Sequence, residues 1–162
     1  MIDGATAGRL VLVGSSMGGW IATLAAMARP DRIAGLVTIA AAPDFTERLI
    51  WDRLDPAARA RMLADGFLVQ PSAYDPAGYR ITRTLVEEGR RHLILGGTVP
   101  VTAPVRLLHG MRDTDVPHEL SLELAGAITG DDVRITMVED GDPRGSRDPD
   151  IELGVTTVAE MP

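Results

Sequence analysis

The sequence predicts an α/β fold, with a mostly parallel sheet between two layers of helices. Four short apolar runs have the length and composition of strands: Arg9–Val13, Ile33–Ala40, Val105–His109 and Val133–Val138. Helical spacing follows the first and the third of these runs, over Met17–Arg29 and Glu119–Ile128. Short apolar strands that alternate with helices are typical of βαβ units, whose parallel sheets are covered on both faces.

A long middle segment, from about Pro43 to Pro104, interrupts this alternation. It contains two helical patterns, Arg48–Ala64 and Thr82–Leu95, and no clear strand. Because it is too long for an ordinary loop, we interpret it as a helical insertion over about residues 44–102. The length of 162 residues fits one domain, so we expect residues 1–162 to form a single domain with this insertion.

Composition excludes several classes of function. The net charge of −7 argues against a nucleic-acid partner, which needs a basic face. The chain has no cysteine, so disulfides, thiolate metal sites and a cysteine nucleophile are excluded. No apolar run is long enough for a membrane span, and the N-terminus lacks a signal-peptide pattern. We therefore expect a cytoplasmic protein.

The sharpest motif is Gly14-Ser15-Ser16-Met17-Gly18, which fits G-x-S-x-G between a predicted strand and a predicted helix. In this context the pattern indicates a nucleophile elbow, with Ser16 as the nucleophile. The backbone N–H of Met17 would then bind the oxyanion. The alternative is a glycine-rich turn that only packs. A phosphate loop is disfavoured, because the lysine of that motif is absent.

A nucleophilic serine needs a base and a carboxylate that orients the base. Asp113 follows the predicted strand Val105–His109, at the sheet edge where the predicted elbow also lies. We predict Asp113 as the acid and keep Asp115 as the second choice. The alternative for Asp113 is a turn residue or a helix cap, positions that aspartate favours.

Two segments resemble the α/β-hydrolase esterases: Leu10–Trp20 resembles their elbow, and Leu107–Asp113 with Val116-Pro117 resembles their acid turn. Within that family, Tyr79–Thr82, Arg91–Leu93 and Pro104–Arg106 are similar to the acyl-protein thioesterase and acyl-glucuronide esterase branch of the abhydrolase-domain proteins. The resemblance implies a three-layer α/β-hydrolase-type sandwich with a helical cap. It also implies a small acyl ester or thioester substrate, an acyl-enzyme on Ser16, and no metal or organic cofactor.

The first departure from the family concerns its catalytic histidine, which follows the last strand, usually as Gly-Asp-His. This chain has Gly141-Asp142-Pro143, so the histidine position is Pro143. Of the three histidines, His118 is the one plausible surrogate. We expect His109 to be structural and His92 to lie at the surface or in the cap.

The second departure is that the elbow begins at residue 14, whereas the family has several strands before it. We therefore expect the N-terminal strands to be missing, as in a truncated reading frame or a degenerate copy. The strand Arg9–Val13 would then form an open edge, which favours self-association.

Three functions stay open. The first is a serine hydrolase of esters or thioesters. The second is a non-catalytic hydrolase-like binding protein, which Pro143 favours, and the third is an inactive fragment. Five apolar residues of the cap would line an acyl pocket or belong to its core: Phe45, Leu49, Trp51, Met62 and Phe67.

Overall fold

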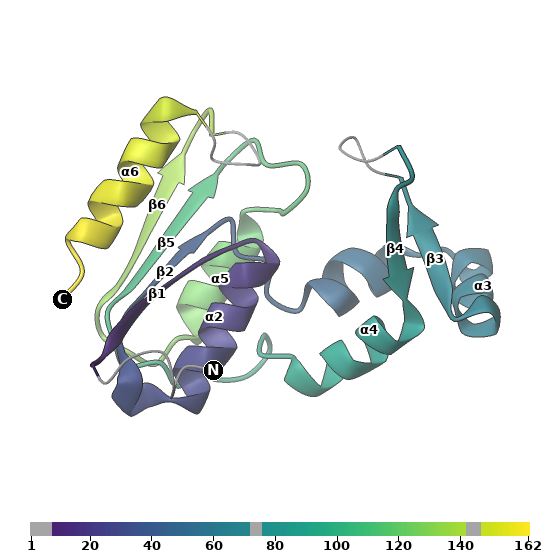
Figure 1. The fold of residues 1–162 in the computed structure, drawn as a ribbon, viewed down its shortest axis with the longest axis horizontal. Helices are drawn as coiled ribbons and strands as arrows, with labels where there is room; N and C mark the ends of the chain where they lie inside the picture. Colours follow the sequence, from purple (N-terminus) through teal and green to yellow (C-terminus); the bar gives the residue numbers. More distant parts are fainter. Residues whose placement is uncertain (1–7, 72–75, 142–146) are drawn as a thin grey trace. The chain divides into compact units, whose positions relative to one another are not determined.

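The computed structural model describes residues 8–71, 76–141 and 147–162 (Figure 1). The chain divides into two compact units. The first consists of Met1–Pro43 and Ile94–Pro162, and the second of Asp44–Leu93. The limits expected for the insertion, 44–102, stay a prediction.

The first unit is built on a four-stranded parallel sheet with the order β1-β2-β5-β6. The strands are β1 (Leu10–Ser15), β2 (Ile33–Ile39), β5 (Val105–Gly110) and β6 (Val133–Val138). The central strand β2 is an almost continuous apolar run, as expected for a strand that is covered on both faces, and Val105, Leu107 and Leu108 of β5 are buried beside it. Because all four strands run in the same direction, their carboxyl ends meet at one edge of the sheet.

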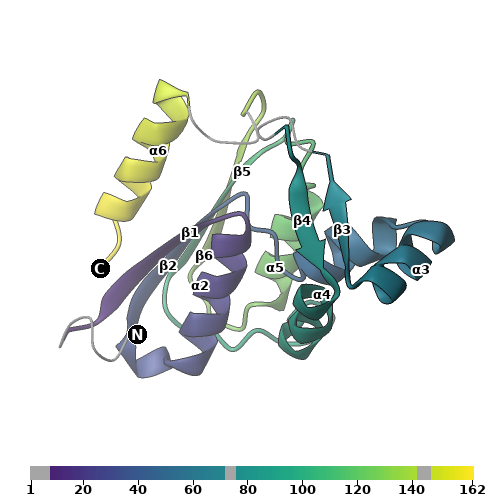
Figure 2. The same cartoon turned by 45° about the vertical axis from the view of Figure 1, so that its right-hand side comes forward.

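Three helices cover this sheet: α2 (Met17–Ala28), α5 (Glu119–Ala127) and α6 (Asp148–Ala159). Figures 1 and 2 show α2 and α5 on one face and α6 on the other. The three-layer α/β arrangement predicted from the sequence is therefore confirmed. A short 3-10 turn, Pro30–Arg32, ends the first crossover at the predicted proline.

The terminal helix α6 forms although Gly154 and a β-branched run lower its helix propensity. Gly154 is buried, and a β-carbon there would lie 3.8 Å from the Cδ1 atom of Ile39 on β2. Packing against the sheet therefore compensates for the weak local propensity. Leu36 and Val37, whose side chains point to opposite faces of β2, are both fully buried.

The second unit is not purely helical. A π-helical turn (Thr46–Ile50) and a 3-10 turn (Trp51–Arg53) precede α3 (Pro56–Asp65). An antiparallel hairpin follows, with β3 (Phe67–Gln70) and β4 (Tyr79–Thr82). Then come α4 (Arg83–Gly89) and a 3-10 turn (Arg90–His92). The expectation that this segment contains no strand is wrong.

The prediction of a single helix over Arg48–Ala64 is also wrong, because the helical conformation is interrupted before Pro56. Leu54 and Asp55 are extended. Asp55 then caps α3 by accepting the N–H of Ala58 at 2.7 Å, and Pro56 occupies the start of the helix. Proline is tolerated in the first turn and disrupts a helix interior, so the same residue that was placed inside the predicted helix begins a new one.

The strand β1 pairs with β2 alone among the residues that the structure describes. The side chain of Val13 on this strand is 51% exposed. The self-association expected at this edge stays a prediction. Within the described ranges, no helix combines the length and the apolar character that a membrane crossing requires.

Candidate functional site

The backbone of Ser16 adopts a strained conformation between β1 and α2. Its φ is 52° and its ψ is −122°, in a region that costs a non-glycine residue about 1–3 kcal/mol. Its N–H donates to the carbonyl of Ile39 at 2.9 Å, and its carbonyl accepts the N–H of Ala42 at 3.0 Å. Both bonds fasten the turn to the end of β2. Ser16 is therefore held exposed at the carboxyl edge of the sheet.

The glycines of the motif differ in what they allow. A β-carbon at Gly14 would overlap the carbonyl oxygen of Gly18, so the close passage of β1 beneath α2 requires glycine there. A β-carbon at Gly19 would lie 2.8 Å from the β-carbon of Ala41 on the chain after β2. At Gly18 a β-carbon would meet no described atom within 4 Å. The tight turn therefore depends on Gly14 and Gly19.

We expect Gly14→Ala to lower the free energy of unfolding by about 2–4 kcal/mol, because the new methyl group collides with backbone that cannot move independently. The matched variant is Gly18→Ala, which adds the same methyl group where space is open and within helix α2. It should be neutral or stabilise by up to about 1 kcal/mol. Urea unfolding of both variants measures the difference. Equal losses would contradict the elbow geometry.

Met17 is the first residue of α2, so its N–H has no acceptor one turn earlier in the helix. The N–H of Gly19 already donates to the carbonyl of Ser16 at 2.9 Å. The donor of Met17 therefore lies at the positive end of the helix dipole, beside the serine. Its role as the oxyanion donor stays a prediction.

Asp113 presents a buried carboxylate with one oxygen hydrogen-bonded and the other 3.8 Å from the Nε2 atom of His109. Its Oδ1 atom accepts the N–H of Asp115 and the N–H of Val116, each at 2.8 Å. The side chain is 1% exposed, and Oδ2 has no hydrogen-bond partner among the described residues. An unpaired buried carboxylate oxygen is costly, and it is the group that a triad acid offers to an imidazole N–H. Asp115, by contrast, is exposed.

His109 is buried beneath this turn and stabilises it. Its Nε2 atom lies 2.9 Å from the carbonyl of Val116, which can only accept, so Nε2 carries the proton. Its Nδ1 atom accordingly accepts from the hydroxyl of Ser121 at 2.7 Å. Burial lowers the pKa of His109, although the Val116 carbonyl and Asp113 both raise it. A neutral imidazole with both nitrogens occupied fits the structural role that we expected.

The other histidines have no hydrogen bond to Asp113 in the described part of the chain. His118 precedes α5 with its side chain 28% exposed, and its Nδ1 atom lies 3.8 Å from a carboxylate oxygen of Glu119. His92 lies in the second unit and is exposed. Pro143 falls outside the described residues, so the prediction about that position stays a prediction.

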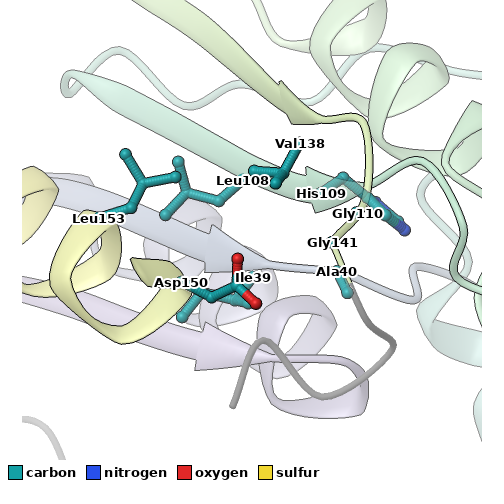
Figure 3. A pocket seen from close by; sticks show the side chains of 9 residues that line it. All are labelled: Ile39, Ala40, Leu108, His109, Gly110, Val138, Gly141, Asp150 and Leu153. Atoms are coloured by element: carbon teal, nitrogen blue, oxygen red, sulfur yellow. The ribbon is translucent and has the colours of Figure 1, made fainter. Parts of the chain in front are cut away.

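The chain leading to position 143 passes directly against the acid strand. A β-carbon at Gly110, the last residue of β5, would lie 2.5 Å from the carbonyl oxygen of Gly141. Gly110 and Gly141 also line a small cavity of about 30 Å³ with Ala40 and Asp150 (Figure 3). Residue 141 is the last described residue before position 143, so the segment that bears this position begins next to the start of the acid turn.

An ion-pair cluster that sequence reasoning missed joins both sides of that segment. Arg147 donates to the two carboxylate oxygens of Asp150 at 2.7 and 2.8 Å. It also lies 3.0 Å from Asp140, and this interaction lowers the pKa of the Asp140 carboxyl. The spacing of Arg147 and Asp150 at a helix start was the available signal. The carboxylates of Asp140 and Asp150 are therefore both paired with Arg147.

Topology places Ser16 and Asp113 at the same sheet edge but on strands separated by β2. Strands in a sheet lie about 4.8 Å apart, so β1 and β5 are roughly 10 Å apart. No described side chain is hydrogen-bonded to both residues. The described residues therefore supply a candidate nucleophile and a candidate acid, and the position that the family uses for its base lies outside them.

A profile of the family described as "alpha/beta hydrolase fold" matches residues 3–70. The mitochondrial palmitoyl-protein thioesterase ABHD10 of Mus musculus is 36% identical over 162 residues, which is 99% of this chain and 54% of the relative. The Homo sapiens protein of the same name is 33% identical, over 99% of this chain and 53% of the relative. The chain thus spans about half the length of the curated relatives it matches.

Two solved structures of hydrolase-fold proteins superpose closely on this chain. A putative hydrolase from Agrobacterium vitis superposes with a TM-score of 0.89 at 39% identity, over 93% of this chain and 60% of the other. The alpha/beta hydrolase domain-containing protein 10 from mouse superposes with a TM-score of 0.88 at 37% identity, over 98% of this chain and 64% of the other. The chain has the α/β-hydrolase fold.

The predicted α/β-hydrolase fold and the resemblance to that family are confirmed. The motif residue Ser16 lies at the strand-to-helix turn typical of the fold, and Asp113 lies beyond the strand two positions away. The relatives are named mitochondrial, so the expected cytoplasmic location is not confirmed.

Proposed function

We propose that this chain belongs to a serine hydrolase of thioesters or esters, in which Ser16 is acylated and Asp113 orients the base. The observation that carries the proposal is the strained backbone of Ser16, held at φ 52° by hydrogen bonds to the neighbouring strand end. Strain of this kind persists only where the surroundings enforce it, and it concentrates at active sites. The palmitoyl-protein thioesterase name of the relatives supports an acyl thioester as the substrate class.

The chemistry follows from the positions of these groups. The hydroxyl oxygen of Ser16 attacks the acyl carbon while a base removes its proton. Negative charge develops on the acyl oxygen, and the N–H of Met17 stabilises it. Collapse of the tetrahedral intermediate expels the thiol or alcohol, which takes the proton from the base. Water then attacks the acyl-enzyme by the same route and regenerates Ser16.

The unpaired Oδ2 of Asp113 supports the assignment of the acid. Two backbone N–H groups fix the orientation of the carboxylate through Oδ1, so Oδ2 is free to accept the N–H of an imidazole. A surface turn residue or a helix cap does not need a carboxylate that is 1% exposed with an oxygen left unpaired.

A second candidate function is binding of acyl compounds without turnover, which the proline at position 143 favours. Proline has no ionisable side chain, so it cannot transfer a proton. In this case Ser16 would retain its geometry but would not be activated as a nucleophile.

Mass spectrometry of acylated protein tests the proposal. We expect Pro143→His, incubated briefly with a nitrophenyl ester of a short fatty acid, to gain the mass of one acyl group. The adduct should map to the tryptic peptide Leu10–Arg32, whose serines are Ser15 and Ser16.

Two alanine variants in the Pro143→His background locate the adduct. Ser16→Ala should abolish it, whereas the matched variant Ser15→Ala should retain it. An adduct that survives Ser16→Ala would reject Ser16 as the nucleophile. Absence of any adduct in Pro143→His would favour the binding function.

A further inference from the structure

The second unit contains a cavity of its own, of about 250 Å³. Its walls come from the π-helical turn, helix α3 and the hairpin, and they are mainly aliphatic: Leu49, Leu54, Met62, Leu68 and Ile81. A site of this volume lies just below the range typical of drug-sized ligands. It therefore fits one slender apolar chain better than a bulky ring system.

Only two of the five apolar cap residues expected to line an acyl pocket, Leu49 and Met62, line this cavity. Phe45 and Trp51 pack instead against the core cluster around Ile50. The ring of Phe67 lies under the guanidinium of Arg80, with 3.9 Å from Cζ to the ring centroid.

Two arginines also line the cavity, and both lack a charged partner. Arg53 and Arg61 are exposed, and within the described residues neither forms a hydrogen bond or an ion pair. Some other arginines of this unit have carboxylate partners, whereas Arg59 and Arg80 contact the rings of aromatic residues. Arg90 binds Glu47 at 2.7 Å, and Arg91 binds Glu88 at 2.8 Å.

An arginine without a carboxylate partner can bind an anionic ligand. Its planar guanidinium group has five N–H donors, and their geometry matches the two oxygens of a carboxylate. The carboxylate of Asp55 accepts the N–H of Ala58 as the cap of α3, and among the described residues it forms no ion pair with either arginine. The guanidinium charge is also constant at all ordinary pH values. The cavity thus joins aliphatic walls to two cations that have unused donors.

We propose that this cavity binds a fatty carboxylate, with its chain along the aliphatic walls and its carboxylate on Arg53 and Arg61. Charge complementarity selects the anion, and the apolar lining selects a ligand with a chain. Every residue that lines the cavity belongs to Asp44–Leu93, and Ser16 does not.

Met62 provides a specific probe of the site. It is fully buried and lines the cavity. It is also the one methionine of the seven in the chain that lies within Asp44–Leu93. A ligand in this cavity therefore changes the methyl signal of Met62, whereas a ligand near the elbow changes that of Met17.

The experiment titrates decanoate into the complete chain labelled with ¹³C at the methionine methyl groups, at constant ionic strength and below the micelle-forming concentration. We expect a saturable shift of the Met62 signal, with the same affinity in Ser16→Ala. The uncharged analogue decanol should bind at least about tenfold more weakly, because it cannot form charge-assisted bonds with the arginines.

Variants then test the two cations. The double variant Arg53→Gln with Arg61→Gln should weaken decanoate binding about tenfold or more and leave decanol binding unchanged. Arg91→Gln, which removes one charge from the same unit away from the cavity, is the matched control and should bind decanoate normally. The two single variants replace the double variant if the latter fails to fold.

Three results would overturn the proposal. One is a Met62 signal that does not move at saturating decanoate. Another is movement of the Met17 signal alone, which would place the ligand in the first unit. The third is equal affinity for decanoate and decanol, or equal affinity in the double variant and the parent chain.

Discussion

Replacing Pro143 with histidine is expected to raise the Ser16-dependent rate of ester hydrolysis by about 10⁴-fold. Loss of one member of a serine–histidine–carboxylate unit typically lowers kcat by roughly 10⁴–10⁶, and the residual catalysis comes from binding and the oxyanion donors. The family pattern Gly-Asp-His corresponds to Gly141-Asp142-Pro143 in this chain. The remaining elements, Ser16 and Asp113, need an imidazole to transfer the proton.

The measurement is the steady-state rate with a nitrophenyl ester of a short fatty acid, for the chain and for Pro143→His. Ser16→Ala in each background gives the rate that does not depend on the nucleophile. A gain that persists in Ser16→Ala would contradict the expectation, because it would come from the new histidine alone. A rate in Pro143→His equal to that of the parent chain would also contradict the expectation.

The sheet and its helices could be predicted because burial on both faces dictates the sequence of each strand. Ile33–Ile39 is an apolar run that hydrophobicity alone identifies. The positions of Ser16 and of the acid turn could also be predicted from the strands. Both follow a predicted strand at its carboxyl end, where open α/β sheets carry their sites.

The hairpin of the second unit could not be predicted with the same rules. Its strands have four residues each, and neither alternates between buried and exposed side chains. Their pairing of Phe67 with Thr82 is a contact between distant parts of the chain, which propensity does not specify. The break at Pro56 was readable, since Asp55-Pro56 has the residues typical of a helix start.

Features that depend on tertiary contacts could not be predicted from the sequence. The motif suggests that Gly14 and Gly18 are both required, yet only Gly14 faces a backbone collision among the described atoms. The unpaired oxygen of Asp113 is set by the burial of the turn around it. The link from Arg147 to Asp140 depends on where the start of α6 lies relative to the end of β6.

Replacing Asp113 with asparagine in the Pro143→His chain should lower kcat by about 10⁴-fold. The amide keeps an oxygen for the two backbone N–H groups that now bind Oδ1. Its NH₂ group then takes the place of Oδ2, and a donor at that point cannot accept the N–H of the imidazole. The histidine would therefore adopt the wrong tautomer to remove the proton of Ser16.

Asp115→Asn is the matched control, because Asp115 is in the same turn, has the same charge and is exposed. It should retain activity within about threefold, since exposed substitutions away from the reacting groups have small effects. Thermal unfolding of both variants checks that the turn remains folded.

The most direct test of a Ser16–Asp113 site is therefore kcat for Pro143→His with Asp113→Asn, compared with Pro143→His with Asp115→Asn. A loss of about 10⁴-fold for the first and near-normal activity for the second is the predicted result. Equal activity of the two variants, or a larger loss for Asp115→Asn, would show that Asp113 is not the acid of the site.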